Sequence, residues 1–356
     1  MSKIEWTEAT WNPIVGCSII SPGCTNCYAM RMAARLEAMG RPQYAGLTRP
    51  SKAGAVWTGV MRLVENALLL PLRTRKPTTY FVNSMSDLFH ESVPDAWIDR
   101  VFAVMALAPQ HTFQVLTKRA RRMRAYCARR DERGRHPSMT DAALMAATGR
   151  WNTPARDLRR WPLPNVWLGV SAEDQRRADE RVPELLATPA AVRFVSAEPL
   201  LGSIDFTAIA IDDHYVLDAL RGLYVGLTPE AAPYFPNNAL DWIIVGGESG
   251  PGARPMHPDW ARQIRDVSAA AGVAFHFKQH GAWTVAIDRE AQDPDWRADY
   301  SGRLNDSRPG VAWLNLKGGR GFHGERFHVM RRVGKAAAGR LLDGLTHDDM
   351  PAVRHG

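Results

Sequence analysis

Three of the four cysteines, Cys17, Cys24 and Cys27, fall within eleven residues, and thiols at this spacing could hold a metal. Pro22 and Gly23 favour a turn between the first two cysteines, which would fold the first thiol back toward the others. Thiolates held this close repel one another and are stabilised by a cation. Because the N-terminus shows no secretory signal, we expect metal ligands here rather than a disulfide.

The identity of the metal is open between zinc and an iron–sulfur cluster, with free thiols as a third interpretation. A closed structural zinc site needs a fourth protein ligand. Cys127 lies far along the chain, and the first histidine is His90. An iron–sulfur cluster also needs four ligands, but a substrate or cofactor can supply the fourth. Three thiols with one position left over therefore favour a catalytic cluster over a structural metal.

Several segments between Trp6 and about Gly344 carry a resemblance to a known family. The chain resembles radical S-adenosylmethionine enzymes and, more closely, the phage-borne and bacterial branch of radical-SAM-like proteins related to spore photoproduct lyase. It departs from the superfamily pattern in having six residues between Cys17 and Cys24 instead of three, and Asn26 in place of an aromatic residue before Cys27. The matching segments are TWNPIVGCS, GCTNCYA, FVNSMSDLFHE, FQVLTKR, WLGVSAED, RFVSAEPLL, WIIVGGESGPGARPM, FKQHGAW and VGKAAAGRLLDG.

The resemblance implies that Cys17, Cys24 and Cys27 each bind one iron of a [4Fe–4S] cluster. It further implies that S-adenosylmethionine binds the fourth iron, and that an electron from the cluster cleaves it to a 5′-deoxyadenosyl radical. An external electron donor is then required. The reaction expected from the resemblance is a lyase-type repair of a thymine photolesion, or modification of a base, with DNA expected over RNA.

Composition sets limits that agree with such a role. The 356 residues, 45% of them hydrophobic, suffice for one large domain or two smaller ones. A net charge of +8 favours a polyanionic partner. No apolar run approaches the roughly 18 residues that a membrane helix needs, and the N-terminus lacks an apolar signal region. We therefore expect a cytoplasmic protein with no membrane partner.

Short apolar runs alternate with helical patterns along most of the chain, which predicts an α/β fold. The runs lack strict polar alternation, as is typical of a parallel sheet covered on both faces. Alternation of strand and helix predicts right-handed βαβ units and a full or partial (β/α) barrel over residues 1–284. A helix is predicted from the spacing of Trp260 to Ala271, with Pro258 near its start and Gly272 just past its end. Excursions are expected at 133–160 and 206–240. An irregular extension is expected at 285–356, ending in a helix that carries Lys335 and residues 340–342. The predicted strands are 11–15, 79–84, 112–117, 166–171, 193–197, 242–246 and 273–278.

Polar residues follow these strands, where (β/α) barrels carry their chemistry. Helix capping is the competing interpretation for each Ser or Asp, and close strand–helix packing is the competing interpretation for the paired glycines. Buried carboxylates are harder to explain structurally, because a lone buried charge is costly. The candidate catalytic residues are Glu198, Glu248 and Lys118. The candidate cofactor-binding residues are Asn83, Ser84, Asp87, Ser171, Gly246 and Gly247.

A basic segment begins at the end of the 112–117 strand and contains few acidic residues. It is either a solvated helix face or a contact for a phosphate backbone. The candidate nucleic-acid residues are Arg119, Arg121, Arg122 and Arg124, with Arg49, Lys52, Arg73, Arg75 and Lys76 as an extension of the same surface. Candidate stacking rings, each of which could equally be core, are Trp57, Trp151, Trp161 and Trp283.

Two alternatives remain beside the enzyme. The chain could be a non-catalytic nucleic-acid-binding protein stabilised by zinc or by an iron–sulfur cluster. It could also be a redox-sensing or partner-docking protein of a mobile element. Spore photoproduct lyase uses a cysteine as hydrogen donor, but Cys127 lies within the basic segment without the family's surrounding pattern, and we expect it to be a structural thiol.

Overall fold

A seven-stranded sheet organises the chain, and its strands follow the order β1-β6-β7-β8-β9-β13-β14. The computed structural model describes residues 4–52, 54–149, 161–228, 231–234, 238–289, 309–316 and 327–352. The sheet is parallel, and β1 and β14 are its two edges among these residues, so the barrel is partial rather than closed. The α/β prediction is confirmed. The strands are β1 (Ala9–Trp11), β6 (Thr79–Val82), β7 (Thr112–Thr117), β8 (Val166–Ser171), β9 (Val192–Ala197), β13 (Trp242–Gly246) and β14 (Ala274–Gln279).

The predicted first strand at 11–15 is wrong in its extent. β1 ends at Trp11, and β2 (Ile14–Val15) instead pairs antiparallel with β5 (Arg62–Leu63), outside the large sheet. Pro13 has no N–H to donate, so the ladder cannot continue through it. The preceding Asn12 uses its side-chain oxygen to accept from the N–H of Met85. The loop that carries Cys17, Cys24 and Cys27 (residues 16–27, the cysteine loop) therefore follows β2 and not a strand of the parallel sheet.

The chain divides into two compact units. The first holds Met1–Ser171, Arg181–Phe194 and Ala352–Gly356, and the second holds Ala172–Glu180 and Val195–Pro351. The helices of the first part of the chain are α1 (Tyr28–Ala38), α2 (Glu65–Leu68), α3 (Leu70–Arg73), α4 (Asp95–Ala106), α5 (Ala120–Cys127) and α6 (Asp141–Thr148), and α7 (Gln175–Leu186) follows β8. The basic segment forms α5, as its helical interpretation predicts.

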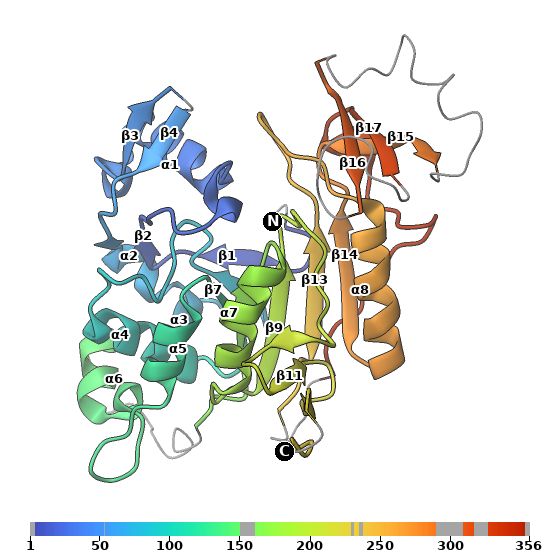
Figure 1. Cartoon of the computed structure of the whole chain (residues 1–356). Coiled ribbons are helices and arrows are strands. Elements are labelled where there is room, and N and C mark those ends of the chain that lie inside the picture. Colours follow the sequence, from blue (N-terminus) through green and yellow to red (C-terminus); the bar gives the residue numbers. More distant parts are fainter. Residues whose placement is uncertain are drawn as a thin grey trace. The chain divides into compact units, whose positions relative to one another are not determined.

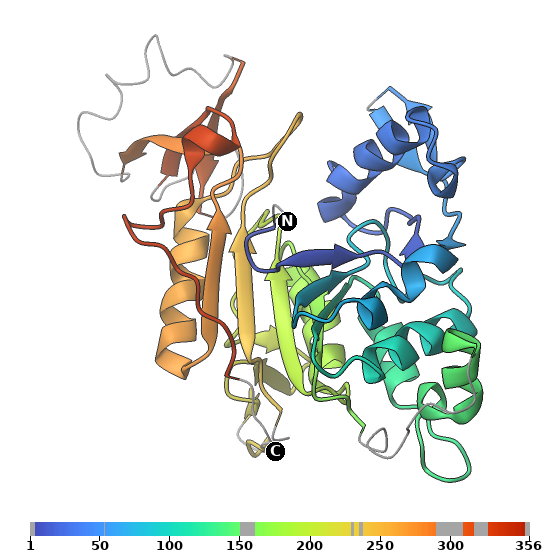
Figure 2. The same ribbon diagram turned by 180° about the vertical axis from the view of Figure 1, so that it is seen from behind.

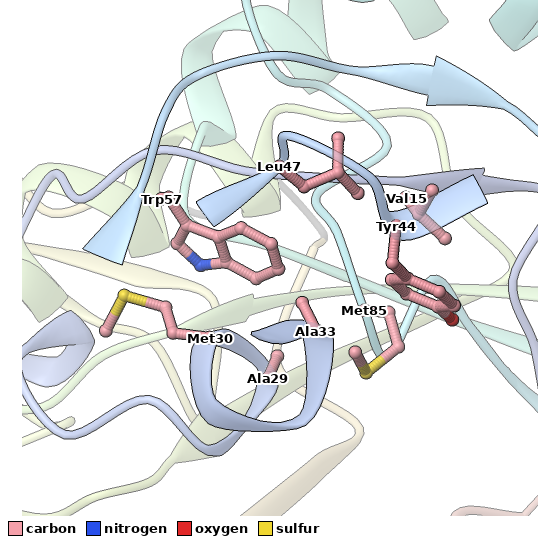
Figure 3. Close-up of a cluster of buried hydrophobic side chains, with 8 residues drawn as sticks. All are labelled: Val15, Ala29, Met30, Ala33, Tyr44, Leu47, Trp57 and Met85. Carbon is pink, nitrogen blue, oxygen red and sulfur yellow. The ribbon is translucent and has the colours of Figure 1, made fainter. Parts of the chain in front are cut away.

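A small hydrophobic core lies in the first unit, and Figure 3 shows its side chains. It is built by residues of β2, α1, the segment 44–47, β4 (Gly54–Trp57), which pairs with β3 (Thr48–Ser51), and the segment after β6. Cys17 and Cys27 pack against this cluster, which holds two of the three thiols in place. Its members are Val15, Ala29, Met30, Ala33, Tyr44, Leu47, Trp57 and Met85.

In the second unit, α8 (Pro258–Ala271) packs along β14 (Figures 1 and 2). The helix has the bounds that its sequence predicts, because Pro258 opens it and Gly272, at a φ of +69°, ends it. The 206–240 excursion contains the strands β10 (Ile209–Ala210), β11 (Tyr215–Asp218) and β12 (Leu223–Gly226), which form one antiparallel sheet.

The extension at 285–356 is more regular than predicted. β15 (Trp283–Arg289), β17 (Phe327–Arg332) and β16 (Val311–Asn315) form an antiparallel sheet in that order. The helix predicted to carry Arg340 to Leu342 is shorter, because α10 (Lys335–Ala338) ends at Gly339, whose φ is +73°. Within the described ranges, none of the helices has the length and apolar character needed to cross a membrane.

Candidate functional site

The cysteine loop is held at its start by a backbone contact that only glycine allows. Gly16 has a φ of +102°, and a Cβ on it would lie 2.0 Å from the carbonyl oxygen of Val60. The carbonyl of Cys17 then accepts a hydrogen bond from the N–H of Gly59. A 3-10 turn follows at Pro22–Cys24, as predicted from the Pro-Gly pair, and the loop ends at Cys27, the N-cap residue of α1.

The three sulfurs act on one another electrostatically. Burial, Asp87 and the thiolates of Cys27 and Cys24 together raise the pKa of Cys17 to about 12, against the lowering effect of Arg119. Burial also raises the pKa of Cys27, against the lowering effect of the N–H groups of the first turn of α1. A bound metal would offset this repulsion, since metals hold thiols in the deprotonated form.

Two cations from the end of β7 act on these thiols. Arg119 lowers the pKa of Cys17, and its Nη1 lies 4.0 Å from the sulfur. Lys118, the preceding residue, lowers the pKa of Cys27 and donates from Nζ to the hydroxyl of Ser171, over 2.6 Å. Adjacent residues at one strand end therefore act electrostatically on two different cysteines, and Arg119 is the one in contact with a sulfur.

Arg119 is buried and bound on three sides, with 7% of its surface exposed. Its Nη1 donates to Asp87 over 3.0 Å, its Nε donates to Glu91 over 2.8 Å, and its Nη2 donates to Ser18 over 2.7 Å. The sequence suggested a contact with phosphate at this position. The geometry instead favours a role beside Cys17.

Asp87, a predicted cofactor-binding residue, organises the end of β7. One carboxylate oxygen accepts from the hydroxyl of Thr117 and the N–H of Phe89, and the other accepts from Lys118 N and Arg119. Each oxygen thus already receives two protein donors. Asp87 therefore has a positioning role, in which it orients Thr117, Lys118 and Arg119.

Asn83 and Ser84 end β6 in two different roles. Asn83 is 3% exposed with a φ of +60°, its Oδ1 accepts from the N–H of Ile14, and its Nδ2 has no partner among the described residues. A buried side chain with an unpaired donor costs stability and points to a ligand, whereas asparagine adopts the positive φ readily. The hydroxyl of Ser84 donates to Asn12, and its carbonyl accepts from Tyr28, which ties the strand end to α1.

The other candidate nucleic-acid arginines lie on α5 with carboxylate partners. Arg122 donates to Asp95, and its side chain is 25% exposed. Arg124 lies 3.2 Å from Glu184, with half of its side chain exposed, and Arg121 lies 3.7 Å from the same carboxylate with 92% exposed. Of the four predicted arginines, Arg121 and Arg124 are thus the two on the surface.

In the second unit, both candidate catalytic carboxylates have cationic partners. Glu198 lies 2.9 Å from Lys278, and Glu248 accepts from Nε and Nη2 of Arg254. The cost of a lone buried charge, which motivated these two candidates, is therefore offset inside the protein. Nothing in the sequence spacing indicated the pairing of Glu248 with Arg254.

Close packing accounts for the two glycines that follow the core of β13. A Cβ on Gly246 would lie 2.5 Å from Oε1 of Glu198, and one on Gly247 would lie 2.1 Å from the carbonyl oxygen of His280. Gly247 therefore requires glycine in the absence of any ligand, whereas a side chain at Gly246 would displace the carboxylate of Glu198. For Gly246 and Gly247, the structure therefore favours close packing over cofactor binding.

The remaining candidates are mostly core residues. Cys127 is fully buried, and burial raises its pKa, which fits the expected structural thiol. Trp57 and Trp283 are each 7% exposed, and Trp161 stacks on His136 with ring centroids 3.7 Å apart. Trp151 lies outside the described residues.

The donor set of the loop fits an iron–sulfur cluster in its chemistry. Among the described residues, no group of three or more His, Cys, Asp or Glu side chains is placed to hold one metal ion. The cysteines of a cluster each bind a different iron, so they need not converge on one point. Three thiols with two cations against them suit a group that carries negative charge, and the unpaired amide of Asn83 adds a donor for a further ligand.

Comparison with known proteins places the chain in one family. The family profile described as "Protein of unknown function (DUF5131)" matches residues 1–351, so the chain belongs to this family. Searches of curated proteins and of solved structures found no match.

Proposed function

We propose that this member of the DUF5131 family is a radical S-adenosylmethionine enzyme that carries a [4Fe–4S] cluster and acts on nucleic acid. The observation that carries the proposal is the set of three thiols with Arg119 in contact with Cys17 at 4.0 Å and Lys118 acting electrostatically on Cys27. Buried like charges are costly unless cations offset them.

The chain's own residues would divide the work at this site. Cys17, Cys24 and Cys27 would hold three irons, and the bound cluster and S-adenosylmethionine would supply one-electron cleavage of the sulfonium. The unpaired Nδ2 of Asn83 is a donor suited to a carboxylate or carbonyl of the cofactor. Lys118, held by Ser171, adds a positive charge that acts on Cys27.

Nucleic acid is the proposed substrate class because of charge and one exposed ring. The net charge is +8, and Arg121 on α5 is almost fully exposed. Tyr28 follows Cys27 directly, is 51% exposed, and is fixed by the hydrogen bond from its hydroxyl to the carbonyl of Ser84. A ring held this way can stack an unpaired base next to the cysteine loop.

The test is a turnover assay under anaerobic conditions. Protein reconstituted with iron and sulfide is mixed with S-adenosylmethionine and a reductant, and 5′-deoxyadenosine is quantified with irradiated DNA, undamaged DNA, RNA or no nucleic acid. We expect product from the wild type and from Cys127→Ser, and none from Cys17→Ala, Cys24→Ala or Cys27→Ala. Turnover that survives loss of all three cysteines would refute the proposal.

The packing of Cys17 and Cys27 on the core cluster supports one alternative. A metal in this loop would also tie it to the fold, as structural metals do. The protein would then be a metal-stabilised nucleic-acid-binding protein without catalysis. One zinc per chain, salt-dependent binding of nucleic acid and no cleavage of S-adenosylmethionine would favour it.

A further inference from the structure

We infer that Arg119 is a positioning residue that raises the reduction potential of the group held by Cys17, Cys24 and Cys27. The inference rests on the proposed function, because it requires a cluster at these thiols. It assigns Arg119 a role that differs from the phosphate contact expected from the sequence. The role depends on three observations: the fixation of the guanidinium, its contact with Cys17, and its control of Ser18.

The guanidinium has little freedom to move. Asp87 and Glu91 accept from two different edges of its planar fork, and Ser18 accepts from a third nitrogen. Asp87 is itself fixed by Thr117 and by backbone N–H groups. An arginine whose planar guanidinium is hydrogen-bonded at several nitrogens is pre-organised, so its positive charge stays in one position. That position is 4.0 Å from the sulfur of Cys17.

Arg119 also restricts the hydrogen-bonding role of the Ser18 hydroxyl. Nδ1 of His90 accepts from the N–H of Ser92, so the ring proton lies on Nε2, which donates to Ser18 over 2.8 Å. Arg119 donates to the same oxygen. With both lone pairs occupied, the hydroxyl can act only as a donor. Ser18 follows Cys17 directly, so this donor is available to a group bound there.

The same geometry excludes a serine-nucleophile interpretation of Ser18 and His90. A general base would have to accept the serine proton on Nε2, but Nε2 carries the proton in this arrangement. The pair therefore supplies a fixed donor, and Arg119 completes it.

A fixed cation and a fixed donor both favour the reduced form of a cluster, because reduction adds negative charge. Hydrogen bonds and charge near the sulfurs are known determinants of cluster potentials. Removing Arg119 would also leave the buried carboxylate of Asp87 facing Cys17 without its cation. Both effects make reduction harder, so they act in the same direction.

The experiment measures midpoint potential in four reconstituted variants. Iron and acid-labile sulfide are quantified first, and the reduced cluster is then followed by electron paramagnetic resonance during a redox titration. Arg119→Gln should lower the midpoint by at least a tenfold change in the reduced-to-oxidised ratio, which is about 59 mV for one electron. Arg119→Lys, which keeps the charge without the fork, should lower it less.

Glu91→Gln is the variant of opposite sign. Its side chain is 65% exposed, and glutamine retains an oxygen that can accept from Nε of Arg119, so the fold is preserved. Removing this negative charge should raise the midpoint. The matched control is Arg100→Gln, which deletes the same charge from a different arginine–carboxylate pair, with Glu65, and should leave the midpoint unchanged.

The outcomes separate this inference from the proposed function. Wild-type protein that takes up no iron and sulfide would overturn the proposed function, and this inference with it. Full cluster content with an unchanged midpoint in Arg119→Gln would overturn this inference alone. If Arg119→Gln does not fold, Glu91→Gln decides: a midpoint that is unchanged or lower contradicts the inference.

Discussion

Replacement of Gly16 by alanine tests whether the fold itself sets the path of the cysteine loop. Gly16 precedes Cys17, its N–H donates to the carbonyl of Met85, and its φ is +102°. An alanine Cβ would lie 2.0 Å from the carbonyl oxygen of Val60, whereas a carbon–oxygen contact needs about 3.3 Å. The backbone of one of the two segments must therefore move.

The structure supplies the magnitude and the control. A left-handed conformation costs alanine about 1–2 kcal/mol, and overpacking adds about 1–3 kcal/mol. Gly59, on the segment that faces Cys17, has a φ of +84° and open space where its Cβ would be. Gly59→Ala should therefore cost only about 1–2 kcal/mol, and Gly16→Ala about 2–5 kcal/mol.

Two measurements read out this comparison. The free energy of unfolding of the metal-free chain is determined in urea, and iron per chain is determined after anaerobic reconstitution. We expect Gly16→Ala to be the less stable variant by at least about 1 kcal/mol and to lose iron, and Gly59→Ala to retain it. Equal destabilisation of the two variants, with full iron in both, would refute the close approach of Val60 to Gly16.

Three further predictions concern other parts of the chain. Burial lowers the pKa of His136 from 6.5 to about 4, so the stability that this residue contributes is present above pH 6.5 and is lost as the pH falls toward 4, by at most about 3 kcal/mol. His136→Gln should therefore reduce the pH dependence of the unfolding free energy between pH 6.5 and 4. An unchanged dependence would contradict this. An alanine Cβ at Gly169 would lie 2.5–2.6 Å from three ring atoms of buried Phe194. Gly169→Ala should therefore lower the free energy of unfolding in urea by about 1–3 kcal/mol, and by less in a Phe194→Leu background. Equal losses in the two backgrounds would argue against the overlap. Lys278→Met should destabilise the chain by about 2–3 kcal/mol and Lys278→Met with Glu198→Gln by less than the sum of the single changes; strict additivity would show that the pair is not coupled.

Much of the fold could be predicted because its strands are continuous apolar runs. β7, β8 and β13 have the bounds that these runs predict, and α8 ends at the glycine expected to end it. The first strand could not be delimited in this way, since the apolar run of residues 11–15 hides the interruption at Pro13. The final helix failed for a related reason, because apolar spacing continues past Gly339 while the backbone turns there.

The sequence singles out the three thiols but not the residues around them. Cysteine spacing predicts a metal loop, and that stays a prediction until the metal content of the protein is measured. The sequence does not show which arginines of a basic run are buried. Arg119 differs from Arg121 through contacts with Asp87, Glu91 and Ser18, which are distant in the chain. The close packing at Gly246 likewise depends on Glu198, which follows another strand.

Elemental analysis of anaerobically reconstituted protein tests the central claim most directly. Iron, acid-labile sulfide and zinc are quantified in the wild type, in a triple variant with alanine at Cys17, Cys24 and Cys27, and in Cys127→Ser. The account predicts about four irons and four sulfides per chain in the wild type and in Cys127→Ser, and neither in the triple variant. One zinc without sulfide in the wild type, or a full cluster in the triple variant, would contradict it.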